Sequence, residues 1–306
     1  MAEQERIFNF MGPRKLLALI SGLMLLASIA SLAINGLRFG LDFTGGSLVE
    51  VGYEQAADLN TVRAQLQEAG FNDAIVQTFG ASTDVLIRLG ETHDPQLGDK
   101  VVQALTTNGE QVDLRRNEYV GAQVGEELRE QGGLGMLLAL AMIMLYLAFR
   151  FQFKFSLGAV LALVHDVTLV LGAFSLLQLD FDLTVLAAVL AVIGYSLNDT
   201  IVVFDRIREN FRIMRVADSV EIMNASLSQT LSRTLVTSLT TVLVLIALFV
   251  FGGETIHGFA TALLIGIGVG TYSSIYVAAN LLLTMNVTKE DLIAPPKEDT
   301  EVDEMP

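Results

Sequence analysis

Six apolar runs in the sequence are long enough to cross a lipid bilayer, which takes roughly 20 mostly apolar residues. They lie near residues 15–35, 134–150, 156–178, 183–204, 230–251 and 257–285. Because the bilayer core offers no hydrogen-bond partners to an open backbone, apolar runs of this length are expected to be α-helices. The sequence therefore predicts a polytopic α-helical membrane protein with six transmembrane helices, in agreement with its 52% hydrophobic composition.

The first run could be mistaken for a secretory signal peptide. It follows Arg14 and Lys15, and the segment Ala27–Ala30 resembles a cleavage site. However, its apolar stretch Leu16–Ile34 is longer than the core of a typical signal peptide. We therefore expect an uncleaved transmembrane helix at residues 15–35.

Basic residues between the runs predict the orientation, because short cytoplasmic loops are enriched in Lys and Arg. The connection after the second run contains Arg150 and Lys154, and the loop 205–229 is rich in arginine. The short connections near 178–183 and 252–257 contain no Lys or Arg. We therefore expect both ends to be cytoplasmic: the N-terminus, 1–14, and the acidic tail, 286–306. The remaining five helices, within residues 132–285, are expected to form one bundle.

Residues 36–131 are expected to form a small α+β domain on the outer side. The segments alternate in the order βαββαβ, and Asp58 is a candidate N-cap for the first helix. This order is typical of a ferredoxin-like, split βαβ arrangement. The predicted strands and helices are Ser47–Tyr53, Asp58–Ala69, Asp73–Phe79, Asp84–Leu89, Pro95–Leu105 and Gln111–Val120.

Two opposite charges, Asp199 and Arg233, fall within or at the edge of apolar runs. A charge at the centre of a membrane helix costs about 2.5–3.5 kcal/mol, so such residues are functional candidates. At a rise of about 1.5 Å per residue, Asp199 lies about 9 Å and Arg233 about 5–9 Å from the cytoplasmic edge. If their helices are neighbours, the two side chains can pair. The structural alternative is an Arg233 that reaches the interface and a neutral Asp199 bonded to Asn198 or Ser196.

His165 and Asp166 lie about 14 Å inside the third run, by the same rise per residue. Adjacent helical residues point in directions about 100° apart, so the pair is not expected to share one narrow face. A proton relay and a structural hydrogen bond between helices are both open interpretations. Asp166 and Asp199 could also form an intramembrane aspartyl protease. That interpretation is disfavoured because Arg233 would keep Asp199 ionised, whereas such a dyad shares a proton.

Small residues recur at every fourth position of the last run and indicate a close helix contact, either inside the bundle or with a partner. Gly266 and Gly270 are its central members. Asp42, Gly45 and Gly46, just after the first run, are typical of a tight turn at the membrane rim. The full stripe is Gly258, Ala262, Gly266, Gly270, Ser274 and Ala278.

The composition also excludes several functions. The chain contains no cysteine, which rules out disulfides, thiol catalysis and cysteine-ligated metals. A net charge of −15 argues against nucleic acid as a partner. We expect no cofactor, no metal site and no enzymatic activity.

Several motifs together resemble the SecF proteins of the SecD/SecF family of protein translocase subunits, a branch of the resistance–nodulation–division superfamily. Residue 122 is an alanine, whereas the family usually has proline at this position. The link between the outer domain and the second run therefore lacks the rigidity that a proline would give it. The matching segments are Gly40–Gly46, Val120–Leu128, His165-Asp166, Gly194–Asn210, Leu231–Thr234 and Gly266–Ala278.

The resemblance implies a function in protein export across the bacterial inner membrane, with residues 36–131 in the periplasm. The implied partners are SecD, the SecYEG channel, the translocating polypeptide and membrane lipids, with the proton gradient as the energy source. It places Asp199 and Arg233 in the proton path. One rival is a half-subunit of a proton-coupled small-molecule exporter. Another is a passive assembly factor, which would need no charge in the membrane.

Overall fold

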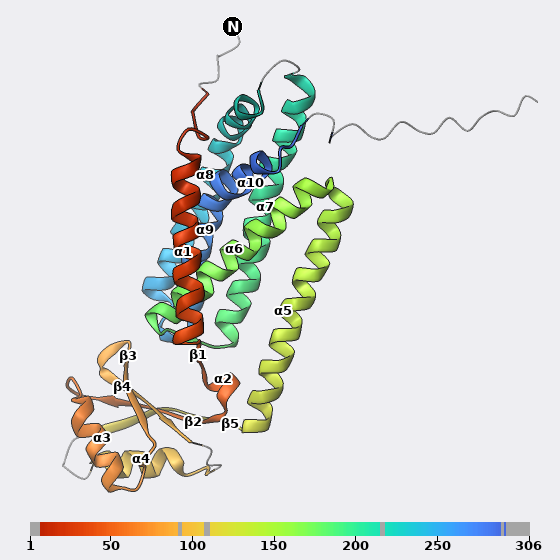
Figure 1. The fold of residues 1–306 in the computed structure, drawn as a ribbon. Helices are drawn as coiled ribbons and strands as arrows, with labels where there is room; N and C mark the ends of the chain where they lie inside the picture. The colour runs from red at the N-terminus through yellow and green to blue at the C-terminus, as the bar shows by residue number, and fades with distance from the viewer. Residues whose placement is uncertain (1–6, 91–93, 107–110, 215–217, 289–290, 292–306) are drawn as a thin grey trace, which may run out of the picture.

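The computed structural model describes residues 7–90, 94–106, 111–214, 218–288 and 291. It consists of a long helical bundle with a small α+β domain at one end (Figure 1). Helix α1 leads from the N-terminus down to this domain, and α5 leads back along the side of the bundle. Most of the predicted acidic tail, residues 289–290 and 292–306, lies outside the described residues.

Within the described residues, six helices are long and apolar enough to cross a membrane, so the chain is a multi-pass membrane protein. The last of them changes from α- to π-helical geometry and back. The helices are α1 (Arg14–Ile34), α5 (Ala122–Arg150), α6 (Phe153–Leu177), α7 (Leu183–Ile213), α8 (Ser219–Phe251), and α9 (Glu254–Tyr272) continued by the π-helical segment η2 (Ser273–Ala278) and by α10 (Ala279–Thr284).

Helices α7 and α8 extend well into the segment 205–229, which was expected to be a loop. Helix α7 continues to Ile213, and α8 already begins at Ser219. The extensions are stable because their apolar residues Ile207, Phe211 and Met223 belong to the buried core of the bundle. The connecting residues 215–217 lie outside the described part of the chain.

The core of the bundle is formed by α6, α7 and the last helix. In each of these, 56% of the most apolar window is buried, compared with 11%, 6% and 17% in α1, α5 and α8. The apolar outer faces of the latter three are therefore available to lipid or to other subunits. A cluster of aromatic rings closes the core where α5, α6 and α7 meet: Phe155 packs edge-to-face on Phe204 at a centroid distance of 5.4 Å and stacks with Phe151.

The α+β domain is a four-stranded antiparallel sheet in the order β3-β4-β2-β5 with two helices. The element order agrees with the prediction, and the Asp58 side chain accepts a hydrogen bond from the Asn60 amide at the start of the first helix. One core, containing Val49, Val51 and Ile87, joins sheet and helices. The elements are β2 (Gly46–Tyr53), α3 (Leu59–Glu68), β3 (Ile75–Phe79), β4 (Ala81–Leu89), α4 (Leu97–Leu105) and β5 (Val112–Val120).

A second, two-stranded sheet joins this domain to the bundle. Strand β1 (Arg38–Phe39), just after α1, pairs in parallel with β6 (Asp180–Phe181), between α6 and α7. A short helix, α2 (Leu41–Thr44), follows β1. Strands β1 and β6 could not be predicted from the sequence, because two-residue strands carry no periodicity.

Candidate functional site

Asp199 is buried in the middle of the bundle, where its carboxylate accepts hydrogen bonds from two neighbouring helices. The Thr234 hydroxyl of α8 donates to Oδ1 at 2.6 Å. The Ser274 hydroxyl of η2 donates to Oδ2 at 2.5 Å. Both partners are themselves buried. The carboxylate thus links α7, α8 and the last helix through hydroxyl groups that can either donate or accept a hydrogen bond.

Arg233 lies beside Thr234 in sequence, but its side chain is exposed on the surface of α8. In the described part of the chain, no ion pair joins it to Asp199, so the predicted pair is not formed here. The reason is geometric. Adjacent helical residues point about 100° apart, and Thr234 occupies the inward direction. Asn198, beside Asp199 on α7, is likewise exposed, and Asp199 bonds neither to it nor to Ser196.

His165 and Asp166 are both buried and are hydrogen bonded to each other, with 2.8 Å between His165 Nδ1 and Asp166 Oδ1. The expected difference in direction between the two residues did not suggest this direct contact. The side chains are long enough to meet beside the helix although their Cβ atoms diverge. The Ser196 hydroxyl of α7 donates to Asp166 Oδ2 at 2.5 Å. The resulting chain, His165–Asp166–Ser196, leads from α6 to the helix that carries Asp199.

Asp166 and Asp199 bind different hydroxyls, and among the described residues no hydrogen bond joins the two carboxylates. A proton-sharing aspartyl dyad requires carboxyl groups in direct contact. The described residues also contain no group of three or more His, Cys, Asp or Glu side chains that could hold a metal ion. The carboxylates of Asp166 and Asp199 are thus each bonded to at least one hydroxyl donor from a neighbouring helix.

The π-helical segment η2 was not predicted from sequence, although such segments are often found at functional sites. It carries Ser274, which bonds to Asp199, and Ser273, whose buried hydroxyl has no partner among the described residues. The wider π turn shifts the side chains that follow it relative to those of α9. The sequence signal that could have indicated it is the pair Ser273-Ser274 in the middle of a long, mostly apolar run.

The small-residue stripe of the last run packs inside the bundle, against α7. A Cβ atom added at Gly266 would lie 2.1 Å from Cγ2 of Val192, and one added at Gly270 would lie 3.1 Å from Cβ of Ser196. Gly270 therefore lets the last helix approach Ser196, the hydroxyl that binds Asp166. The sequence left open whether the stripe contacts a helix of the same bundle or a partner protein. The structure shows a contact inside the bundle.

Gly45 and Gly46 allow three chain segments to meet at the end of the bundle. Both have positive φ, 67° and 117°. A Cβ on Gly45 would lie 2.7 Å from Cα of Ala122, the first residue of α5, and one on Gly46 would lie 2.7 Å from the Leu89 carbonyl oxygen. Ala122 occupies the first position of α5, a position that also accepts proline.

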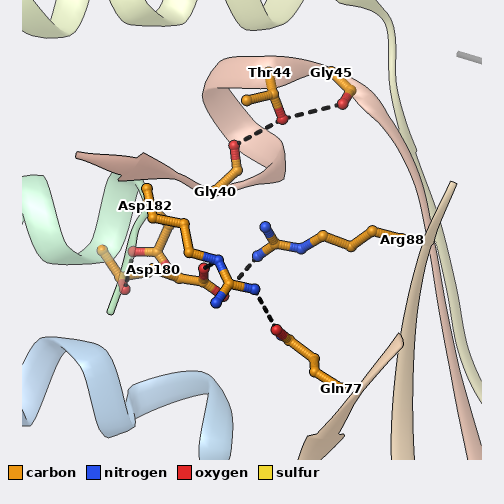
Figure 2. Close-up of polar contacts among 9 residues, drawn as sticks. Gly40, Thr44, Gly45, Gln77, Arg88, Asp180 and Asp182 are labelled. Carbon is orange, nitrogen blue, oxygen red and sulfur yellow. Dashed lines mark hydrogen bonds and ion pairs between the residues drawn. The ribbon is translucent and has the colours of Figure 1, made fainter. Parts of the chain in front are cut away.

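Asp42 and Asp180 attach the α+β domain to the start of α7. Asp42 Oδ2 accepts a hydrogen bond from the Leu183 amide at 3.0 Å, in the first turn of α7. Asp180 binds Arg38 at 2.9 Å and Arg88 of β4 at 2.7 Å, as Figure 2 shows for Arg88. Arg38 also donates to Gln77 of β3. The domain is thus tied by charged groups to the N-terminal end of the helix that carries Asp199.

Comparison with protein families gives two matches. Residues 100–288 match the family described as protein export membrane protein SecD/SecF, C-terminal. Residues 30–57 match the SecD/SecF GG motif. The second match contains Gly45 and Gly46, and the first contains Asp199, Arg233, His165 and Asp166.

Curated relatives match along almost the whole chain. Protein translocase subunit SecF of Pseudomonas aeruginosa is 56% identical over 300 residues, covering 97% of both chains. The protein of the same name from Vibrio alginolyticus is 53% identical, covering 99% of this chain and 98% of its own. The protein of that name from Escherichia coli O157:H7 is 42% identical over 90% of this chain and 86% of its own.

Among solved structures, the chain is similar to SecDF from Thermus thermophilus, described as a translocon-associated membrane protein. The TM-score is 0.85 and the sequence identity 37%, over 94% of this chain. This chain spans 40% of that longer chain. A second structure of SecDF, in a super-membrane-facing form, matches with a TM-score of 0.70.

Proposed function

Since the chain belongs to the SecF group of the SecD/SecF family of protein translocase subunits, we propose that it uses the proton gradient to help draw secreted polypeptides across the bacterial inner membrane. In this proposal it is a transport subunit and not an enzyme. It acts with SecD and the SecYEG channel, and both of its termini are cytoplasmic.

The observation that carries the proposal is the buried carboxylate of Asp199 between two hydroxyl donors on different helices. An ionised carboxylate accepts from both Thr234 and Ser274. A protonated carboxyl has one O–H donor, so one of the two hydroxyls must then change from donor to acceptor or move away. Protonation therefore changes which packing of α7, α8 and η2 is favoured.

The membrane potential supplies enough energy for such a switch. One charge crossing 100 mV releases about 2.3 kcal/mol, which biases a two-state element by tens of fold. The chain His165–Asp166–Ser196 provides a second group of polar side chains, which shares helix α7 with Asp199. We assign it to the relay together with Asp199.

Arg233 and Asn198 support a partner on the α7–α8 face. Both are polar, exposed on the surface of this chain and at the level of Asp199. A guanidinium facing lipid is costly, and a carboxylate on a neighbouring membrane helix would stabilise it. We propose that SecD covers this face and supplies that carboxylate.

The connection between Asp199 and the α+β domain is α7 itself. Asp42 holds the first turn of α7, and Asp180 anchors the domain immediately before it. A shift of α7 therefore moves the attachment of the domain. The strand order and the two helices support a ferredoxin-like arrangement, and we place this domain, within 36–131, in the periplasm.

The test is reconstitution of the purified chain in vesicles, with and without SecD, under an imposed proton gradient. We expect polypeptide translocation that depends on the gradient only when SecD is present. Full activity of the isolated chain would contradict the half-transporter proposal and favour an exporter formed by several copies.

A further inference from the structure

A cavity of about 420 Å³ lies between α1, α6 and the η2 region, away from the α7–α8 face. Its wall is mostly apolar, with Gly22 and Leu25 of α1 and Val164 of α6 among the lining residues. Exposed residues at its edge, including Val164 and Leu161, open it toward the surrounding lipid. A largely apolar cavity of this size with few polar groups is typical of a small-molecule site.

One of these polar groups is a buried nitrogen without a partner. His165 lines the cavity and is only 3% exposed. Its Nδ1 is bonded to Asp166, whereas its Nε2 has no partner among the described residues. An unsatisfied buried polar atom costs about 1–3 kcal/mol, so its persistence calls for an explanation.

The packing of α1 holds the cavity open. Helix α1 contacts α6 closely at Gly172, where an added Cβ would lie 2.2 Å from Ser28, and at Ser31, whose hydroxyl is 2.9 Å from that of Ser175. Nearer the N-terminus, the Tyr272 hydroxyl meets Ser21 at 2.8 Å and donates to the Leu17 carbonyl at 3.0 Å, which attaches α1 to the last helix beside the cavity. Specific contacts therefore fix α1 on both sides of the cavity, at Ser28 and Ser31 on one side and at Ser21 on the other.

The hydrogen bond of Nδ1 determines what Nε2 can bind. An ionised Asp166 can only accept hydrogen bonds, both from Ser196 and from His165, so we take Nδ1 as the donor of this bond and as the carrier of the imidazole proton. Nε2 of the neutral ring is then an acceptor and needs a donor such as a hydroxyl.

The depth of His165 in the membrane further limits the class of ligand that can reach its Nε2 atom. It lies at the centre of α6, about 18 Å from either end at a rise of about 1.5 Å per residue. The polar parts of phospholipids lie outside a hydrocarbon core about 30 Å thick, so they do not reach this depth. We propose that the cavity binds a neutral, lipid-soluble alcohol whose hydroxyl donates to His165 Nε2 and whose apolar body fills the space beside α1.

The proposal is tested by photolabelling the full chain in native-membrane vesicles without a proton gradient, so the result does not depend on export. The probes are a diazirine-bearing hexadecanol, its methyl ether, which cannot donate a hydrogen bond, and a diazirine-bearing phosphatidylcholine. We expect the alcohol to label residues 161–168 and 272–281 at least fivefold more than either of the other two. Equal labelling by the ether or by the phospholipid would overturn the proposal.

Two variants remove the site in different ways. Gly22→Leu fills the cavity, because nothing lies within 4 Å of a Cβ added there, and His165→Phe keeps the ring volume but removes Nε2. Gly135→Leu on α5 is the control, since its added Cβ is equally uncrowded. Monodisperse elution confirms folding of each variant. Labelling by the alcohol should fall at least fivefold in both site variants and not in the control, whereas unchanged labelling in a folded site variant would contradict the proposal.

Discussion

Gly266→Ala should destabilise the bundle by forcing α9 away from α7. The added Cβ would lie 2.1 Å from Cγ2 of Val192, 2.7 Å from its Cγ1 and 3.0 Å from its Cβ. Rotation of Val192 cannot relieve all three contacts, so the helices must separate. Overpacking of this kind costs typically about 1–3 kcal/mol. The measurement is the apparent melting temperature of the purified protein in detergent.

Gly268→Ala is the matched control, because it lies on the same helix and nothing is within 4 Å of its added Cβ. Val192→Ala removes both γ carbons, so the double variant with Gly266→Ala should regain stability. Directly contacting residues typically show coupling of about 0.5–3 kcal/mol in a double-mutant cycle. If Gly266→Ala is as stable as Gly268→Ala, or if the double variant shows no coupling, the proposed α7–α9 contact is refuted.

Three other substitutions test separate parts of the account. Arg233→Lys and Arg233→Met should both impair export, because Lys lacks the planar fork and Met lacks the charge; wild-type export by both would exclude an ionic partner for Arg233. Asp180→Asn should speed hydrogen exchange at Gly40, whose amide donates to the Phe181 carbonyl at 2.8 Å, since Arg38 and Arg88 lose their shared carboxylate; unchanged exchange would show that the ion pairs do not anchor the domain. Gly45→Ala should lower protein abundance in membranes through strain at positive φ and the contact with the start of α5; normal abundance would show that the junction tolerates a side chain.

The six membrane helices could be predicted because length and composition alone specify a membrane span. The α+β domain followed from alternation and from the Asp58 cap. The extensions of α7 and α8 were missed because the charges of 205–229 suggested a loop, whereas a few apolar residues such as Ile207 and Phe211 were enough to pack them into the core. The β1–β6 pair and η2 depend on tertiary contacts and have no periodic signal.

The ionisable residues of the candidate site could be predicted from the sequence, but their hydrogen-bond partners could not. Asp199 and His165 stand out because ionisable groups are rare in apolar helices. Their partners, Thr234, Ser274 and Ser196, are ordinary membrane-helix residues, and only the helix arrangement brings them to the carboxylates. The pairing of Asp199 with Arg233 was inferred from equal depth, and depth does not determine the direction in which a side chain points.

The central claim is that a proton on Asp199 drives export. The most direct measurement is polypeptide translocation into vesicles containing the complex with SecD, with and without a proton gradient, for wild type and Asp199→Asn at equal abundance. The control is Asp205→Asn, which removes a carboxylate toward the C-terminal end of the same helix, where Asp205 pairs with Arg150 at 2.7 Å. The account predicts that Asp199→Asn loses the gradient-dependent part and Asp205→Asn keeps it. Full gradient-dependent translocation by Asp199→Asn would contradict it.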